Sequence, residues 1–199
     1  MKTEEIFEDL FSRYSKLQAC RETIKKSYKI LETCYEHGKK LLLCGNGGSA
    51  SDCEHIVGEL MKGFLLPRKV ESSVLAGKKL QYGLPAISLV SQSSLISAVA
   101  NDNGESMVFA QQVMGYGNAG DVILGISTSG NSENVVLALE LAKERGLFTI
   151  ALTGEEGGRL GKIVDCCITV PEVETYKVQE LHLPIYHCLC MMLEQRFFG

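Results

Sequence analysis

The first 37 residues carry apolar positions at the spacing of amphipathic helices. Two sets of such positions follow each other, the first being Ile6, Leu10, Tyr14 and Leu17 and the second Ile24, Tyr28 and Leu31. Gly38 comes after the second set and suits the C-terminal stop of a helix. The pattern therefore predicts one or two helices over residues 3–37.

From residue 39 onwards, short continuous apolar runs alternate with segments of helical spacing. The runs that we expect to be strands cover 40–44, 84–90, 121–126, 148–152 and 166–170. The expected helices cover about 50–63, 92–100, 102–114, 133–145 and 175–198, and the third of them opens on a capping box at Asp102–Glu105. This alternation predicts an α/β fold with a five-stranded parallel sheet covered by helices on both faces. We expect a single domain over 1–199, with N-terminal helices over 1–38 and the α/β core over 39–199.

The stretch from 64 to 83 has no clear period. It is long for a connection in a compact domain, which makes it a candidate functional loop. Lys78 and Lys79 lie within it and are open to two interpretations, as solvated loop residues or as neighbours of a ligand.

Two polar loops each follow a predicted strand and open a predicted helix. The first runs from Cys44 to Ser49 and the second from Gly125 to Ser132. Both place small residues where backbone N–H groups can approach a ligand, and the helix N-terminus beyond adds partial positive charge. Serine and asparagine also cap helices, so each loop alone is open to that interpretation. Two such loops at strand ends of one sheet favour a ligand site.

The residues of these loops indicate a small anionic ligand. Four hydroxyl groups of the second loop can surround a phosphate with neutral donors, namely those of Ser127, Thr128, Ser129 and Ser132. The first loop lacks the GxGxxG spacing and the second lacks the lysine of a P-loop, so we expect no nucleotide cofactor.

Composition and charge exclude other partners. The net charge is −4 and no basic block is present, which argues against nucleic acid and against an anionic membrane surface. The N-terminus is polar and no apolar run reaches the roughly 20 residues of a membrane span, so we expect a cytoplasmic protein. The eight cysteines include no CxxC pair, which favours reduced core thiols over a disulfide framework or a thiolate metal site.

The helix after the first loop carries a candidate acid–base pair. His55 and Glu59 are four residues apart and share a helix face with Asp52. A solvated surface pair would show the same spacing, and a single histidine such as His187 is commonly a packed core residue. Pro184 precedes His187 and is expected to kink the last helix.

Three segments resemble the signature segments of phosphoheptose isomerases. These are Cys44-Gly-Asn-Gly-Gly-Ser-Ala50, Gly125-Ile-Ser-Thr-Ser-Gly-Asn-Ser132 and Gln179-Glu-Leu-His-Leu-Pro-Ile-Tyr-His187. The resemblance spans nearly the whole chain and implies a flavodoxin-like phosphosugar-isomerase (SIS) domain. It also implies a homotetramer with active sites at subunit interfaces. The implied reaction is the aldose–ketose isomerisation of sedoheptulose 7-phosphate to D-glycero-D-manno-heptose 7-phosphate.

The resemblance implies roles for individual residues. Glu59 falls on the catalytic base and His187 on the catalytic acid of an isomerisation that passes through an enediol. Some members bind zinc through four positions, occupied here by His55, Glu59, Gln179 and His187. Zinc on His187 would compete with its use as a proton donor. The residues expected to contact the sugar phosphate are Asn46, Gly47, Ser49, Gln92, Ser127, Thr128, Ser129, Ser132 and Gln179.

Two positions depart from the family pattern. Gly63 stands where the family usually has an arginine, and Gln92 stands in place of a common aspartate. The segment 68–83 is also longer than the family norm. These departures keep two alternatives open. One is a non-catalytic SIS module that binds a phosphosugar or bridges protein partners, as relatives associated with the replication initiator do. The other is an isomerase for a hexulose phosphate or an amino-sugar phosphate.

Overall fold

The computed structural model describes residues 2–72, 74–75 and 77–199. Its centre is a five-stranded parallel sheet with the strand order β2-β1-β3-β4-β5. The strands are β1 (Leu41–Gly45), β2 (Ala86–Ser88), β3 (Val122–Ile126), β4 (Phe148–Thr153) and β5 (Cys166–Thr169). This order is that of flavodoxin-like folds, which confirms the expected fold class.

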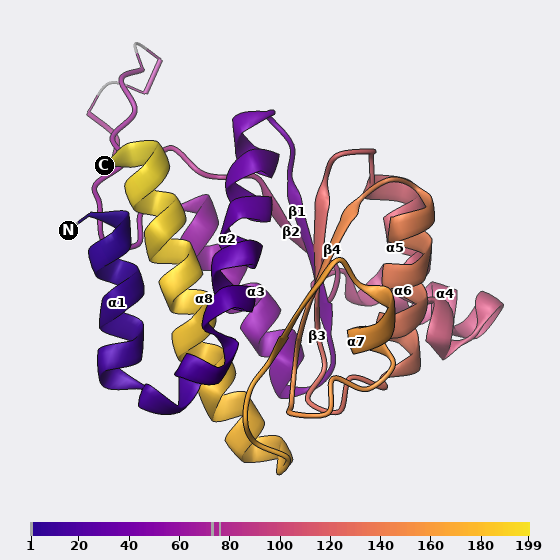
Figure 1. Ribbon diagram of the computed structural model, residues 1–199. Helices are drawn as coiled ribbons and strands as arrows, with labels where there is room; N and C mark the ends of the chain where they lie inside the picture. The colour runs from indigo at the N-terminus through magenta and orange to yellow at the C-terminus, as the bar shows by residue number, and fades with distance from the viewer. Residues whose placement is uncertain (1, 73, 76) are drawn as a thin grey trace.

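Helices cover both faces of the sheet (Figure 1). One layer contains α1 (Thr3–Arg13), the 3-10 helix η1 (Ser15–Cys20), α2 (Arg21–Glu36), α3 (Gly48–Met61) and α8 (Thr175–Phe198). The other contains α4 (Ser93–Asn103), the 3-10 helix η2 (Glu105–Met107), α5 (Ala110–Tyr116), α6 (Glu133–Glu144) and α7 (Leu160–Ile163). Successive strand residues face opposite sides of the sheet. Leu41 and Leu43 therefore pack into the first layer, and Leu42 and Cys44 into the second.

The N-terminal helices form the outer part of the first layer. The apolar faces of α1 and α2 join the same core as α8, and Phe7 and Phe11 stack edge to face within it. Both chain termini lie on this side of the molecule (Figure 1). The helices predicted over 3–37 are thereby confirmed, with Gly38 in the left-handed conformation after α2.

Three elements differ from the sequence pattern. The predicted capping box at Asp102 is wrong, because α4 continues through it to Asn103 and Gly104, with a φ of +97°, ends the helix. β2 is shorter than expected: it begins only at Ala86, since Pro85 has no N–H to contribute to the sheet, and it ends at Ser88. The single turn of α7 is too short for its periodicity to be recognised.

The connection from α3 to β2 projects beyond the body of the molecule, near the chain termini (Figure 1). Lys69 and Gln81 form an isolated antiparallel bridge, and the Tyr82 N–H donates to the carbonyl oxygen of Arg68 at 2.8 Å. The loop thus returns on itself to the end of α3, where the Leu84 N–H donates to the Leu60 carbonyl oxygen at 2.9 Å.

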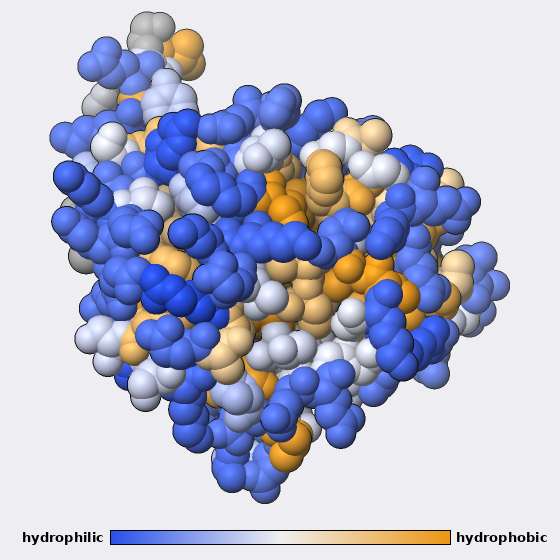
Figure 2. All heavy atoms as spheres, viewed as in Figure 1, coloured by the Kyte–Doolittle hydropathy of each residue, from blue (hydrophilic) through white to orange (hydrophobic). Residues whose placement is uncertain are grey.

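On the face shown in Figure 2, polar residues predominate, and apolar residues show mainly between the two helix layers. In the described part of the chain, no helix is both long enough and apolar enough to cross a bilayer. Each of the eight cysteines, all within the described ranges, is a free thiol. Burial raises the pKa of Cys20 to about 11 and keeps that thiol protonated. Seven of the eight cysteines are buried core residues, and Cys167 is half-buried.

Candidate functional site

The two polar loops lie side by side at the carboxyl ends of the central strands. β1 and β3 are neighbours, and their parallel register pairs Gly45 with Ile126. The following loops leave the sheet together where the strand order reverses, which is the usual ligand position in open α/β sheets. Asn46 and Asn134 join the first loop to α6 through paired amide hydrogen bonds of 2.9 and 3.0 Å.

The second loop forms a group of hydroxyls over 127–132, which we call the hydroxyl loop. Ser127 Oγ and Ser132 Oγ lie 2.9 Å apart. The first turns of α3 and α6, both described, carry no side-chain cap. The interpretation of these serines as helix caps is therefore not supported. Ser127 and Ser132 hydrogen-bond each other, and Oγ of Ser129 accepts the N–H of Asn131. Gly130 permits the turn, because its φ is +66° and an added Cβ would overlap the carbonyl oxygen of Gly157.

Gln179, in the first turns of α8, lies against the start of α3. A Cβ on Gly48 would overlap the Gln179 side-chain amide, so a larger residue here would displace that amide. Burial raises the pKa of Asp52, and hydrogen bonds from Tyr186 and Gln179 oppose that shift. Gln92 lies after the neighbouring strand β2, where its amide nitrogen donates to the Tyr116 hydroxyl.

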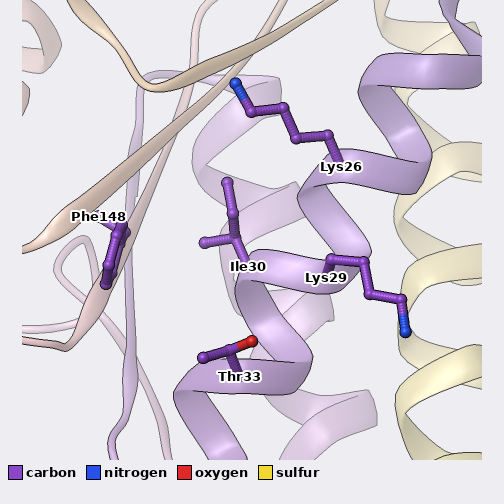
Figure 3. Close-up of a pocket in the computed structure, with 5 residues that line it drawn as sticks. All are labelled: Lys26, Lys29, Ile30, Thr33 and Phe148. Carbon is purple, nitrogen blue, oxygen red and sulfur yellow. The ribbon is translucent and has the colours of Figure 1, made fainter.

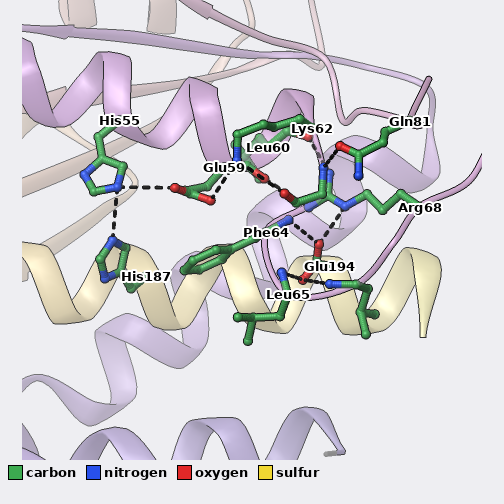
Figure 4. Close-up of polar contacts among 12 residues, drawn as sticks. His55, Glu59, Leu60, Lys62, Phe64, Leu65, Arg68, Gln81, His187 and Glu194 are labelled. Atoms are coloured by element: carbon green, nitrogen blue, oxygen red, sulfur yellow. Dashed lines mark hydrogen bonds and ion pairs between the residues drawn. The ribbon is translucent and has the colours of Figure 1, made fainter. Parts of the chain in front are cut away.

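His55, Glu59 and His187 form a second group, which we call the His–Glu cluster (Figure 4). Nε2 of His55 lies 3.3 Å from Oε1 of Glu59 and 3.4 Å from Nε2 of His187. His55 and Glu59 come from α3, and His187 faces them from α8, which continues through Pro184. The Glu59 side chain is only 14% exposed, and Oε2 has no hydrogen-bond partner among the described residues. Glu59 is therefore largely buried, whereas the His55 side chain is 43% exposed.

Tyr186 holds His55 in place. Its hydroxyl donates to Oδ1 of Asp52 at 3.1 Å and lies 3.1 Å from Nδ1 of His55. Burial raises the pKa of Tyr186 far above its usual range, so the phenol keeps its proton. Because that proton goes to Asp52, the hydrogen-bond network assigns a proton to Nδ1 of His55, which donates to the phenol oxygen. Nε2 of His55 then directs a lone pair into the cluster.

Positive charge is favoured at the His–Glu cluster, and Nζ of Lys62 already lies 3.8 Å from Oε2 of Glu59 (Figure 4). The Nε2 lone pair of His55 faces a carboxylate oxygen of Glu59, and the two repel each other unless positive charge lies between them. Burial and the neighbouring His55 lower the pKa of His187 despite the opposing effect of Glu59, so this imidazole is neutral at pH 7. A neutral His187 can donate a proton through one ring nitrogen.

The donor atoms of the cluster suit zinc in type and spacing. Separations of 3.3 and 3.4 Å match the edge of a tetrahedron with metal–ligand bonds of about 2.0–2.1 Å. Three protein ligands and one open position are the usual pattern of catalytic zinc. Within the described ranges, however, no three His, Cys, Asp or Glu side chains close into a complete metal-binding group. Binding of a metal would therefore require these side chains to move.

The hydroxyl loop and the His–Glu cluster stand at opposite ends of α3. Gly48 begins this helix and Glu59 lies in its last turn, a separation of about 16 Å along the axis. On α8, Gln179 and His187 are separated by about 12 Å in the same way, so Gln179 stands with the loops rather than with the cluster. One chain therefore holds the two groups apart along a polar strip that includes Asp52.

Two other hollows are not lined by residues of the His–Glu cluster. An apolar hollow of about 240 Å³ is lined by Lys26, Lys29, Ile30, Thr33 and Phe148 (Figure 3). Phe148 is the first residue of β4, so this hollow lies toward the amino ends of the strands, opposite the loops. A hollow of about 200 Å³ is lined by Thr128 and Ser129 together with three glutamates, which disfavour an anion on that side of the hydroxyl loop.

The sequence pattern did not identify two contacts of the cluster. Tyr186 stands seven residues after Gln179, on a similar face of α8, and this spacing was the only signal for it. The Phe64 ring lies 5.5 Å from the His187 ring, but Phe64 belongs to the aperiodic stretch, where no pattern marks it.

Comparisons with known proteins identify the family. The sequence pattern of the SIS domain matches residues 7–154. A phosphoheptose isomerase from a Nitratiruptor species is 42% identical over 195 residues, which are 98% of this chain and 91% of the relative. A solved phosphoheptose isomerase from Francisella tularensis is 35% identical with a TM-score of 0.78, covering 96% of both chains. One from Neisseria gonorrhoeae is 32% identical with a TM-score of 0.78, covering 94% of both chains. The chain therefore belongs to the SIS-domain family and, within it, to the phosphoheptose isomerases, so it is an enzyme of the phosphosugar isomerase class.

Proposed function

We propose that this enzyme converts sedoheptulose 7-phosphate to D-glycero-D-manno-heptose 7-phosphate. The observation that carries the proposal is the convergence of the Glu59 carboxylate and the His187 imidazole on His55 in a partly buried cluster. Aldose–ketose isomerisation needs such a base and such an acid. The name shared by the relatives supports a heptose phosphate as substrate.

Glu59 is the proposed base and His187 the proposed acid. The carboxylate removes the proton from the carbon next to the carbonyl, and the released electron pair forms the enediol. His187 gives a proton to the carbonyl oxygen, and the hydroxyl of the neighbouring carbon returns one to the imidazole. Glu59 then delivers its proton to the other carbon. Because protons only change places, the reaction requires no nucleotide cofactor.

The hydroxyl loop is the proposed phosphate site. Neutral hydroxyls and the positive ends of α3 and α6 can hold a dianion without a lysine or an arginine. The phosphate contacts that we propose are Ser49, Ser127, Thr128, Ser129 and Ser132, and the sugar contacts are Asn46, Gly47, Gln92 and Gln179. Substitution of Ser127 or Ser132 by alanine should therefore raise KM more than it lowers kcat.

We propose that the active enzyme is a homotetramer with sites at subunit interfaces. The separation of about 16 Å along α3 supports this, because a second copy would bring its His–Glu cluster to the hydroxyl loop of the first. Co-expression of Glu59→Gln chains with Ser127→Ala chains tests the idea. Mixed oligomers should regain activity through sites that combine an intact loop with an intact cluster, whereas a site within one chain would stay inactive in both.

We propose zinc as a ligand of the His–Glu cluster. His55, Glu59 and His187 would hold it. Gln179, the fourth ligand implied by the resemblance, stands with the loops about 12 Å along α8 from His187 and does not join the cluster within one chain. A bound zinc ion polarises the carbonyl and hydroxyl oxygens of the sugar as a Lewis acid. Elemental analysis of the purified protein measures its content directly. A chelator should lower kcat and added zinc should restore it, and a protein that is fully active without metal would leave His187 as the acid.

We propose that the enzyme works in the cytoplasm. Its eight cysteines, all in the described ranges, are free thiols, which suits a reducing compartment. Titration of the denatured protein with a thiol reagent should therefore detect eight free cysteine thiols.

The alternative of a non-catalytic SIS module rests on Gly63, where the arginine of the family pattern is missing, whereas the relatives support the enzyme. Turnover separates the two. We incubate pure protein with sedoheptulose 7-phosphate and with hexulose phosphates and follow aldose formation. Glu59→Gln should lower kcat about 10²- to 10⁴-fold and still bind ligand by calorimetry. Glu140→Gln, an exposed change on α6, is the matched control. A wild type that binds these sugars without turnover would support the module.

A further inference from the structure

A buried ion pair beyond the His–Glu cluster anchors the loop that follows α3 (Figure 4). Nε of Arg68 lies 2.8 Å from Oε1 of Glu194, and the two side chains are 0% and 2% exposed. Arg68 belongs to the aperiodic stretch, and Glu194 lies near the end of α8. Charges buried to this degree are retained only with several partners. The partners of this pair indicate what it holds in place.

Glu194 gathers the first residues of the loop. Its carboxylate accepts hydrogen bonds from the backbone N–H groups of Phe64 at 2.7 Å, Leu65 at 2.7 Å and Leu66 at 3.1 Å. Three amides directed at one carboxylate fix this segment relative to α8. The segment in turn places the Phe64 ring 5.5 Å from the His187 ring.

Arg68 closes the last turn of α3. Its Nη1 donates to the carbonyl oxygen of Leu60 at 2.6 Å, and its Nη2 donates to that of Glu59 at 3.0 Å. The last carbonyls of a helix lack partners within the helix, and a cation there also interacts favourably with the negative end of the helix dipole. Phe198 packs on the guanidinium at 4.7 Å. Arg68 therefore fixes the backbone of the residue that carries the proposed base.

Gly63 belongs to the same turn. A Cβ at this position would overlap the Leu66 carbonyl oxygen and lie 2.9 Å from Nε2 of Gln81. The Gly63 N–H donates to Oε1 of Gln81, also at 2.9 Å. The turn thus excludes the arginine of the family pattern at position 63, and the buried arginine of this chain comes later, at Arg68.

We propose that Arg68 and Glu194 are positioning residues for the isomerisation, which together hold Glu59 and His187 at the relative position that proton transfer needs. This inference rests on the proposed function. Arg68 contacts the base through its hydrogen bond to the Glu59 carbonyl oxygen. Glu194 contacts the acid indirectly, because it binds the N–H of Phe64, whose ring lies next to the His187 ring. The hydroxyl loop lies at the other end of α3 and is not touched by the pair. A change at either residue should therefore slow turnover with little effect on phosphate binding.

The experiment compares Glu194→Gln with Asp121→Asn. Asp121 is a matched control because its side chain is also 2% exposed, pairs with Lys40 at 2.6 Å and accepts backbone N–H groups, but it lies just before β3. Thermal unfolding is measured first, and kcat and KM follow at a temperature where every variant is folded. We expect kcat to fall about 10- to 100-fold in Glu194→Gln with KM little changed, and to stay within about twofold of wild type in Asp121→Asn.

Arg68→Lys separates positioning from stability. Lysine keeps the charge, but its compact ammonium does not reproduce the planar fork by which Nε, Nη1 and Nη2 of Arg68 bind three separate acceptors. We expect Arg68→Lys to recover most of the melting temperature that Arg68→Met loses, while its kcat stays low. A kcat within about twofold of wild type in both Arg68→Lys and Glu194→Gln would overturn the proposal.

A second readout does not depend on turnover. The chain has four histidines, so the imidazole NMR signals of His55 and His187 can be assigned by substitution. We expect these signals to shift in Glu194→Gln and to stay unchanged in Asp121→Asn. A wild type that turns over no ketose phosphate would defeat the proposed function. Unchanged imidazole signals in Glu194→Gln would separately defeat the positioning inference.

Discussion

Replacing Tyr186 by phenylalanine tests the network that orients His55. The change removes one hydroxyl, which donates to Asp52 and accepts from His55, each at 3.1 Å, and it keeps the buried ring. A hydrogen bond to a charged group contributes about 1.5–3 kcal/mol to stability, and one between neutral groups about 0.5–1.5 kcal/mol. The loss of stability should therefore depend on whether Asp52 is ionised.

The pKa of Asp52 sets the direction of this pH dependence. Burial raises it above the ordinary value of 3.8, and the hydrogen bond from Tyr186 limits the rise because it favours the carboxylate. With a raised pKa in the folded state, the stability that Asp52 contributes is complete below its unfolded pKa and is lost as the pH rises through its folded pKa. Tyr186→Phe raises the folded pKa further and enlarges that loss. The difference in unfolding free energy between wild type and variant should grow from about 0.5–1.5 kcal/mol in acid to about 1.5–3 kcal/mol near pH 7.

Urea unfolding followed by circular dichroism between pH 4 and pH 8 measures the difference. Tyr176→Phe changes an exposed tyrosine of the same helix and should shift stability by less than about 0.5 kcal/mol. His55 loses the partner of its Nδ1 atom, so kcat should fall in Tyr186→Phe but not in Tyr176→Phe. A stability difference that is the same at both ends of the pH range would refute the reasoning, because the hydroxyl would then not bind an ionised Asp52.

Two buried positions outside the His–Glu cluster give further tests. Burial lowers the pKa of His182 from 6.5 to about 4, so the unfolded chain binds the proton first and stability should fall by about 3 kcal/mol as the pH drops from 6.5 to 4. His182→Leu should lack this part of the acid dependence in urea unfolding. Gly130→Ala places a Cβ in left-handed backbone against Gly157, which should cost about 2–4 kcal/mol and raise KM for the sugar phosphate. Gly115→Ala, with open space around its Cβ, is the control and should be neutral or stabilising.

The sheet and its helices were predictable because their signals are local. Apolar runs such as 41–43 and 122–124 are buried on both faces, and this continuous pattern separates a parallel strand from a surface strand. The position of the hydroxyl loop followed from the rule that ligands bind at strand ends. The capping box at Asp102 misled because the same short pattern also fits the end of a helix, where the conformation of Gly104 decides.

The contacts that complete the site belong to the tertiary structure. Arg68 and Glu194 are 126 residues apart in the chain, and Tyr186 and His55 are 131 apart, so no spacing along the sequence relates them. Gly63 looked like a lost arginine until the turn around Leu66 and Gln81 left no room for a side chain. The sequence by itself determined the elements, the strand-end loops and the residue types that carry the chemistry. Only the packing of α8 on α3 decided which of them meet, because burial and hydrogen-bond geometry depend on neighbours that are distant in the chain.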